Sequence, residues 1–266
     1  MSIHPTAIIH PDAEIADGVE VGPYVCIEGS ALIGTGCTLQ AHSILTGDVQ
    51  LGENNLIGYG AVIGAAPQAL SFHPGIKSSV IIGNGNTIRE SCTIHRGMKE
   101  GGVTRVGDHN FLMAGSHLGH DVQLGHHVIL ANNVLLGGHV EIGDRAFIGG
   151  GAVFHQFVRV GELVVAQGNS AFSKDIPPYL IGAERNEAFG LNAVGLRRAG
   201  FTQETRNEIK EAFKLLYKSG LNTRQAVIES KKRVWSEAVQ LFFRFVETAT
   251  KRGIVSLAYQ TGDSPE

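Results

Sequence analysis

The chain has 266 residues, of which 18% are charged, 43% are hydrophobic and 35 are glycine, and its formal net charge is −3. This apolar share with so little charge excludes an intrinsically disordered chain, and the negative balance argues against a general nucleic-acid binder. Glycine is nearly twice as frequent as its usual share of about 7%, yet it follows no collagen period.

The composition changes near residue 175. Residues 1–175 contain 28 glycines, 8 Lys and Arg, and 15 Asp and Glu. Residues 176–266 contain 7 glycines, 14 Lys and Arg, and 10 Asp and Glu. We therefore expect two structural regions, residues 1–175 and residues 176–266.

The sequence shows no sign of export or membrane insertion. The start, Met1-Ser2-Ile3-His4-Pro5, has no basic region followed by an apolar run, and no stretch approaches the length of a membrane span. The three cysteines, Cys26, Cys37 and Cys92, form no C-x-x-C pair. These features predict a cytoplasmic protein with reduced thiols.

Apolar residues recur at every sixth position through most of the first region. The series runs from Ile9 to Ile63, resumes from Ile82 to Ile94, and continues from Val106 to Val160. An α-helix has a period of 3.6 and an alternating strand a period of two, so neither explains the pattern. The period predicts a hexapeptide β-helix, in which three short strands form a triangular coil and the coils stack by parallel pairing.

Two segments leave the six-residue period, one near residues 64–81 and one near 95–105. We expect external loops there, because a solenoid accepts insertions on its surface. After Pro177-Pro178 the period becomes helical, with predicted helices over 202–219, 223–232 and 235–251. The second region is thus predicted to be a small helical domain that caps the solenoid.

A column of histidines is predicted on one face of the prism. Four histidines in successive coils fall near the same position of the 18-residue repeat: His117, His120, His139 and His155. His95 lies just before this column begins. Such a cluster fits surface placement, a metal site with imidazole ligands, or a site for acid–base chemistry and ligand binding.

The pair His120-Asp121 favours acid–base chemistry. A carboxylate next to a neutral imidazole can orient the ring and stabilise the imidazolium that forms when the ring takes a proton. Gly138 lies one coil further on and could offer a backbone N–H to an oxyanion, although the repeat alone also places glycines at corners.

Several longer runs surround these residues: Gly115-Ser116-His117-Leu118-Gly119-His120-Asp121, Gly137-Gly138-His139-Val140, Val153-Phe154-His155-Gln156-Phe157 and Asp175-Ile176-Pro177-Pro178-Tyr179. These runs resemble the UDP-N-acetylglucosamine acyltransferase family, which acts first in lipid A biosynthesis. The resemblance extends over nearly the whole chain, including the helical region. It is more specific than hexapeptide repeats, which indicate only a broad acyltransferase superfamily.

The resemblance implies a left-handed parallel β-helix and a homotrimer with active sites between subunits. It implies transfer of a 3-hydroxyacyl group from acyl carrier protein to the 3-hydroxyl of UDP-N-acetylglucosamine, with no metal or other cofactor. His120 would be the general base, Asp121 would orient it, and the Gly138 N–H would stabilise the oxyanion. Gly168 would set the acyl-chain length. The residues that would bind substrate are Gln68, His95, His117, His139, His155, Gln156, Asn192 and Arg198.

Four positions depart from the family pattern, which usually or often has charged side chains there: Ala69, Ser71, Val194 and Ala199. These changes affect polar recognition of the acceptor rather than the reaction chemistry. An acyltransferase on a related nucleotide sugar, such as a 3-amino analogue, is therefore an alternative. Alternatives of other classes are a β-helix zinc protein of the carbonic-anhydrase type and a non-catalytic scaffold.

Overall fold

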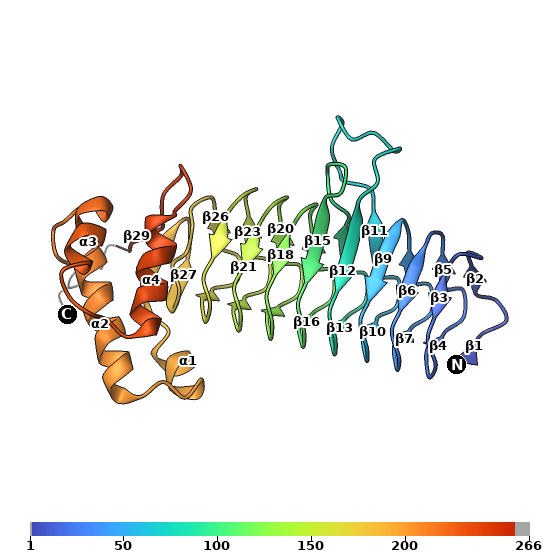
Figure 1. Ribbon diagram of the computed structural model, residues 1–266, viewed down its shortest axis with the longest axis horizontal. Helices are drawn as coiled ribbons and strands as arrows, with labels where there is room; N and C mark the ends of the chain where they lie inside the picture. Colours follow the sequence, from blue (N-terminus) through green and yellow to red (C-terminus); the bar gives the residue numbers. More distant parts are fainter. Residues whose placement is uncertain (1, 259–266) are drawn as a thin grey trace, which may run out of the picture.

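The computed structural model describes residues 2–258 as a long prism of short strands with helices at one end (Figure 1). Three sheets, here named A, B and C, form the sides of the prism. Successive strands of the chain pass from one sheet to the next, and strands of neighbouring coils pair in parallel. The predicted fold class, a left-handed parallel β-helix with a small helical C-terminal region, is confirmed.

Within each sheet, the strands follow one another from coil to coil. Sheet A contains β1 (Ser2–Ile3), β4 (Glu20–Val21), β7 (Thr38–Leu39), β10 (Leu56–Ile57), β13 (Thr87–Ile88), β16 (Phe111–Leu112), β19 (Ile129–Leu130), β22 (Phe147–Ile148), β25 (Val165–Ala166), β27 (Leu180–Ala183), β28 (Glu187–Leu191) and β29 (Ser256–Leu257). Sheet B contains β2 (Ile8–Ile9), β5 (Cys26–Ile27), β8 (Ile44–Leu45), β11 (Val62–Ala65), β14 (Thr93–His95), β17 (His117–Leu118), β20 (Leu135–Leu136), β23 (Val153–Phe154) and β26 (Ala171–Phe172). Sheet C contains β3 (Glu14–Ile15), β6 (Ala31–Ile33), β9 (Asp48–Leu51), β12 (Ser79–Ile82), β15 (Val103–Val106), β18 (Gln123–Leu124), β21 (Glu141–Ile142) and β24 (Arg159–Val160).

The apolar residues of the six-residue period fill the interior of the prism. Leu118 pairs with Leu136 in the next coil, and both side chains are fully buried. Each such aliphatic side chain contributes about 1.5–3 kcal/mol when it is removed from water. Because the same residue of every coil occupies the same place, the core is a continuous column rather than a closed globule.

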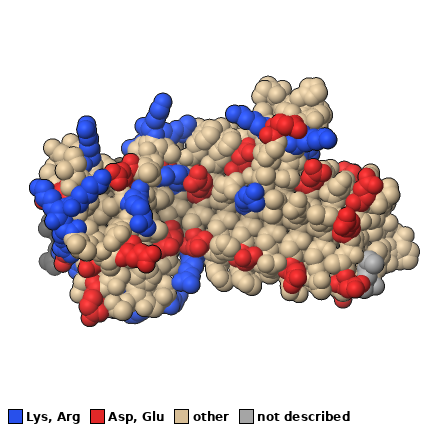
Figure 2. Space-filling model, in the orientation of Figure 1, with Lys and Arg blue, Asp and Glu red and all other residues tan. Residues whose placement is uncertain are grey.

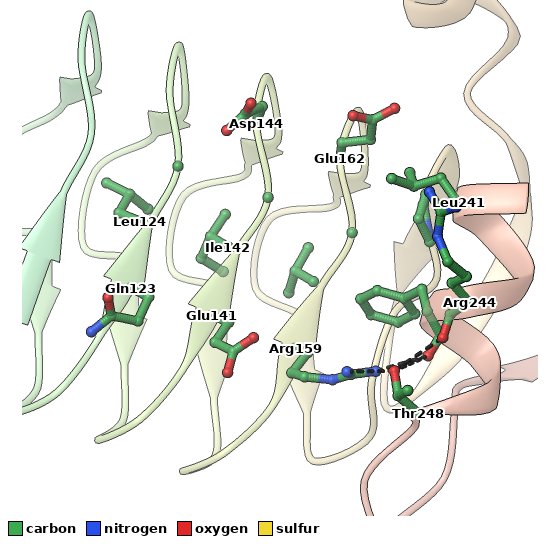
Figure 3. Close-up of a pocket in the computed structure, with 16 residues that line it drawn as sticks. Gln123, Leu124, Glu141, Ile142, Asp144, Arg159, Glu162, Leu241, Arg244 and Thr248 are labelled. Carbon is green, nitrogen blue, oxygen red and sulfur yellow. Dashed lines mark hydrogen bonds between the residues drawn. The ribbon is translucent and has the colours of Figure 1, made fainter. Parts of the chain in front are cut away.

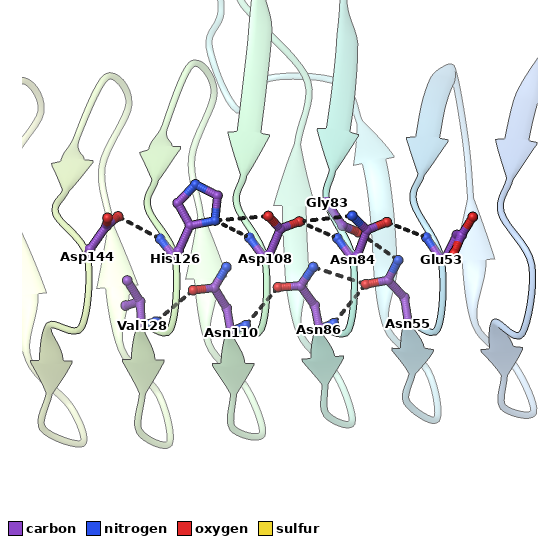
Figure 4. A network of polar contacts seen from close by, with 10 residues as sticks. All are labelled: Glu53, Asn55, Gly83, Asn84, Asn86, Asp108, Asn110, His126, Val128 and Asp144. Atoms are coloured by element: carbon purple, nitrogen blue, oxygen red, sulfur yellow. Dashed lines mark hydrogen bonds and ion pairs between the residues drawn. The ribbon is translucent and has the colours of Figure 1, made fainter.

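A ladder of buried asparagines fixes the register at the corner between sheets C and A (Figure 4). Asn55 Oδ1 accepts from the Asn86 N–H at 2.9 Å, and Asn86 Oδ1 accepts from the Asn110 N–H at 2.8 Å. Asn110 Oδ1 accepts from the Val128 N–H at 2.7 Å. Each side chain thus satisfies a corner backbone N–H of the following coil, which disfavours slippage between coils.

The outward faces of the three sheets differ in polarity between β15 and β26. Sheet A presents Phe111, Ile129, Phe147 and Val165, and sheet B presents His117, Leu135, Val153 and Ala171. Sheet C presents Arg105, Gln123, Glu141 and Arg159. Two faces of the prism are therefore largely apolar, while the third is charged.

Two loops project together from one side of the prism (Figure 1). The first occupies residues 66–78, between β11 and β12, and the second occupies residues 96–102, between β14 and β15. They correspond to the two predicted interruptions. Arg96 joins their bases, because its guanidinium donates to the Gly64 carbonyl at 3.0 Å and lies 5.3 Å from the centre of the Phe72 ring.

In the described part of the chain, residues 2–258, four helices lie beyond the last coil: α1 (Ala193–Arg198), α2 (Gln203–Tyr217), α3 (Thr223–Ser230) and α4 (Glu237–Glu247). The Thr202 hydroxyl caps α2 by accepting from the Thr205 N–H at 3.2 Å. Phe213, Phe242 and Phe243 are buried among these helices. The third predicted helix begins at Glu237 rather than at Trp235, whose indole N–H donates to the Ser230 carbonyl at 2.8 Å.

Arg159 and Asp175 attach the helical end to the solenoid. The fully buried Asp175 carboxylate accepts from Arg159 Nε at 3.2 Å and from the Thr250 N–H at 2.9 Å. The Arg159 guanidinium also donates to the Phe245 carbonyl at 2.9 Å, next to the end of α4. Each of the four helices in residues 2–258 is too short or too polar to span a bilayer.

Candidate active site

The predicted histidine column lies along the edge of sheet B where its strands end and the chain turns toward sheet C. His95 ends β14, His117 begins β17, and His120 follows that strand in the turn. His139 and His155 follow β20 and β23 in the next two coils. Four successive coils thus bring these five histidines to one corner of the prism, as the period predicts.

His120 and Asp121 form a hydrogen-bonded pair. His120 Nδ1 lies 2.8 Å from Asp121 Oδ2, and both side chains are only 15% exposed. Because a carboxylate accepts, the proton of this contact is on Nδ1, so Nε2 of the neutral ring carries the free lone pair. The adjacent residues make contact because Asp121 adopts a left-handed backbone conformation, with φ of 61°.

Gly138 lies directly against the His120 ring. A Cβ atom at position 138 would be 2.5 Å from both Nε2 and Cε1 of His120. Gly138 is buried, and its N–H makes no hydrogen bond with any group in residues 2–258. Buried backbone N–H groups are nearly always paired, so this donor is free to bind a ligand beside the basic nitrogen.

His139 shares the Asp121 carboxylate with His120. His139 Nε2 lies 3.6 Å from Asp121 Oδ2, and its ring meets that of His120 edge-on at 5.0 Å. The ligating atoms of His120, Asp121 and His139 all lie within 4.8 Å of one another, so these three residues could also hold a metal ion. Burial lowers the pKa of His139, which favours the neutral ring.

His95 and His117 form a second imidazole pair, edge-on at 5.1 Å. His95 Nδ1 donates to the Ala66 carbonyl at 2.7 Å, and His117 Nδ1 lies 2.8 Å from Thr93 Oγ1. Burial lowers the pKa of His95, and burial together with His95 lowers the pKa of His117 to about 4. Both rings are therefore neutral at pH 7 and offer hydrogen bonds rather than charge.

His155 and Gln156 are exposed in the turn after β23, one coil beyond His139. The other predicted site residues lie away from the histidines of their own chain. Gln68 is exposed in the first projecting loop, and Gly168 lies at the opposite corner of sheet B, against the Gly150 carbonyl. Arg198 is exposed at the end of α1.

Asn192 has a structural role that the sequence does not show. Its side-chain oxygen accepts from the Gly195 N–H at 2.9 Å and so caps α1, while its side-chain nitrogen donates to the Leu163 carbonyl at 2.8 Å. The residue is 9% exposed. One N–H and one lone pair of its amide are therefore used within the chain, and one of each is left for a ligand.

Two contacts to Asp121 were not anticipated from the sequence. The Asp121 N–H donates to Thr104 Oγ1 at 2.8 Å, and the Met98 N–H donates to Asp121 Oδ2 at 2.9 Å. Thr104 faces the core of the prism at the register position where the preceding coil has Val80. Thr104 could have been identified from the sequence as a polar residue at a core position of the repeat.

A pocket of about 670 Å³ lies elsewhere, between sheet C and α4 (Figure 3). Its charged lining residues are Glu141, Asp144, Arg159, Glu162 and Arg244, and none of the predicted site residues lines it. Figure 3 shows Arg159 crossing this space to α4. The pocket therefore belongs to the junction with the helices, whereas the His120 and His139 side chains lie outside it and are 15% and 33% exposed.

Two sequence profiles match the chain. One, described as UDP N-acetylglucosamine O-acyltransferase, domain 2, matches residues 175–255. The other, described as bacterial transferase hexapeptide (six repeats), matches residues 104–138.

Relatives of known name match the chain over nearly its full length. The acyl-[acyl-carrier-protein]–UDP-N-acetylglucosamine O-acyltransferase of Paraburkholderia phytofirmans is 42% identical, over 95% of this chain and 98% of the relative. The protein of the same name from Campylobacter concisus is 40% identical, over 95% and 97%.

Solved structures agree with these relatives. LpxA from Acinetobacter baumannii has a TM-score of 0.90 at 40% identity, over 95% of this chain and 99% of that one. UDP-N-acetylglucosamine O-acyltransferase (LpxA) from Moraxella catarrhalis has a TM-score of 0.91 at 39% identity, over 96% and 100%. The chain belongs to the UDP-N-acetylglucosamine O-acyltransferase family.

Proposed function

We propose that the protein transfers a 3-hydroxyacyl group from acyl carrier protein to the 3-hydroxyl of UDP-N-acetylglucosamine, the first step of lipid A biosynthesis. The observation that carries this proposal is the arrangement of His120. Its Nδ1 is held by Asp121 at 2.8 Å, and Gly138, whose N–H is unpaired within residues 2–258, lies against its ring. The substrates are inferred from the names of relatives that match 95% of the chain.

The geometry suits a direct attack on the thioester. His120 Nε2 takes the proton of the sugar hydroxyl while the hydroxyl oxygen bonds to the thioester carbon. The Gly138 N–H donates to the oxyanion that forms on the thioester oxygen, and Asp121 stabilises the imidazolium. The carbon–sulfur bond then breaks, and the imidazolium returns its proton to the departing thiolate. No metal or other cofactor takes part in these steps.

The proposed enzyme is a homotrimer. Sheets A and B present apolar residues outward, including Phe147, Leu135 and Val153, which are 40%, 45% and 37% exposed. A closed ring of three prisms buries sheet A of each subunit against sheet B of the next, and it leaves the charged sheet C in water. The histidine corner borders sheet B, so the neighbouring subunit would cover it.

The remaining predicted residues would complete the site in the cleft between subunits. Gln156 is proposed to line the substrate cleft, and Asn192 and Arg198 are proposed to lie near the nucleotide, although the Asn192 amide also makes two hydrogen bonds within its own chain. Gln68, His95, His117, His139 and His155 are proposed to bind substrate. Gly168 is proposed to leave room for a long acyl chain.

The helical end is the proposed docking surface for acyl carrier protein. Lys and Arg side chains gather over the helices, whereas acidic side chains dominate much of the visible prism (Figure 2). A basic surface suits an acidic carrier protein. The cytoplasmic location remains a prediction from the sequence.

The deciding experiment is an assay of the purified protein with several 3-hydroxyacyl carrier proteins. UDP-N-acetylglucosamine and its 3-amino analogue serve as acceptors, and His120→Ala is compared with the unchanged protein. We expect turnover of UDP-N-acetylglucosamine, and a loss of at least about 100-fold in kcat for His120→Ala. The matched control is His127→Ala, because His127 is exposed in another turn of the prism and stacks on His109.

Three results would count against the proposal. No turnover with any donor would favour a scaffold. Brisk turnover of only the 3-amino analogue would change the acceptor and would give Ala69 and Ser71 a role in that choice. Unchanged turnover of His120→Ala would remove the general base.

A further inference from the structure

The position of Asp121 depends on two hydrogen bonds from outside its own coil. Its N–H donates to Thr104 Oγ1 at 2.8 Å, and its Oδ2 accepts from the Met98 N–H at 2.9 Å. Met98 belongs to the loop after β14, and Thr104 belongs to β15, the strand that follows this loop. The loop thus holds the Asp121 side chain, and the strand holds its backbone.

The partners of Thr104 fix the direction of its hydroxyl. Oγ1 also donates to the His95 carbonyl at 2.6 Å. A carbonyl only accepts and an N–H only donates, so the hydroxyl proton points to His95 and a lone pair points to Asp121. Thr104 has no exposed surface, so water cannot replace either bond. One hydroxyl thus joins the backbone that carries His95 to the backbone that carries Asp121.

Packing alone does not explain a threonine at this position. Thr104 pairs with Val80 of β12, which pairs with Val49 of β9, and both valines are buried. Valine has nearly the shape of threonine and would extend this apolar column. A buried hydroxyl is unfavourable unless it is hydrogen-bonded. What threonine adds over valine at this position is therefore its two hydrogen bonds, to the His95 carbonyl and the Asp121 N–H.

Asp121 has a left-handed φ of 61°, as does His139 at the same turn position of the next coil, with φ of 59°. The His139 N–H donates to the His120 backbone carbonyl of the preceding coil, whereas the Asp121 N–H donates to the Thr104 hydroxyl instead. In this conformation Oδ2 lies 2.8 Å from His120 Nδ1. We propose that Thr104 is a positioning residue, whose hydroxyl holds Asp121 in the conformation that directs its carboxylate to His120. This proposal rests on the proposed role of His120 as the general base.

The test is Thr104→Val in the full-length enzyme. Because the substituted atom touches neither substrate, KM should stay unchanged, while displacement of the His120–Asp121 pair should lower kcat by about 10- to 100-fold. Hydrogen–deuterium exchange at the Asp121 amide should become faster, since its acceptor is removed. Thr104→Ser keeps the hydroxyl and should restore both kcat and slow exchange.

The matched control is Val106→Ala, which removes buried atoms from the same face of β15 without a contact to Asp121. Its kcat should equal that of the unchanged enzyme even if its stability falls. If Thr104→Val does not fold, Thr104→Ser and Thr104→Ala decide the question, because they differ only in the hydroxyl.

Wild-type kcat and slow Asp121 exchange in Thr104→Val would overturn the positioning role. If His120→Ala has lost turnover in the same assay, the proposed function stands and only the role of Thr104 is removed. If His120→Ala retains full turnover, the proposed function and the role of Thr104 are both wrong.

Discussion

The imidazole of His120 rests on the α-carbon of Gly138, one coil further along the chain. A methyl group at position 138 would lie 2.5 Å from Nε2, which is closer than non-bonded atoms approach. The two residues are therefore complementary in shape as well as in proposed function. The ring occupies the space that a side chain would need.

We predict that Gly138→Ala displaces the His120 ring and lowers kcat by at least about 100-fold, through misalignment of the general base. Gly138 does not have a positive φ, so the substitution itself does not strain the backbone. Circular dichroism and the melting temperature should show a folded prism. Activity close to that of the unchanged enzyme would contradict the close contact.

We predict that His117 makes the protein less stable in mild acid. Burial, with His95, lowers the pKa of His117 to about 4 in the folded chain, against an ordinary value of about 6.5. The unfolded chain therefore takes up a proton below about pH 6.5 that the folded chain does not take up until about pH 4. Stability is fully present above about pH 6.5 and is lost as the pH falls toward 4. The loss should be less than about 1.4 kcal/mol per pH unit, because the ring is partly exposed.

Urea unfolding of the unchanged protein and of His117→Gln at one protein concentration checks this prediction. Glutamine keeps a donor for Thr93 but does not titrate. The difference in unfolding free energy between pH 7.5 and pH 5 should be smaller in the variant. Equal differences would show that His117 does not contribute.

We predict that removal of metal ions leaves turnover unchanged. His120, Asp121 and His139 could hold a divalent ion, but the proposed chemistry needs His120 as a base and uses Asp121 as its hydrogen-bond partner. Enzyme dialysed against a chelator should keep full activity, and excess zinc should inhibit it reversibly by occupying these side chains. Activity that is lost on chelation and restored by zinc would instead support the zinc-protein alternative.

We predict that Arg159→Met weakens the attachment of the helical end. It leaves the Asp175 carboxylate buried without its cation, which should lower the free energy of unfolding by about 3 kcal/mol. The control is Lys231→Met, which removes an exposed ion pair with Glu247 and should cost less than about 1 kcal/mol. Urea unfolding measures both variants, and equal effects would argue against the role of Arg159.

Much of the site was predictable where the repeat is regular. His120 and Gly138 are 18 residues apart, which is one full coil, so the period alone places them at the same corner. The same argument gathers His117, His139 and His155. The period does not show that Asp121 turns back to His120, because that contact depends on a positive φ at a residue other than glycine.

The fold was predictable from the six-residue apolar period, because a chain that turns after every six residues buries these side chains in a stack of three-sided coils. The sequence also indicated the chemistry, through histidines that the period brings to one corner. How Asp121 is held is visible only in the folded chain, because its N–H donates to the hydroxyl of Thr104, which lies 17 residues earlier in β15. The outward apolar faces of sheets A and B, with Phe147, Leu135 and Val153 exposed, are likewise a property of the folded surface.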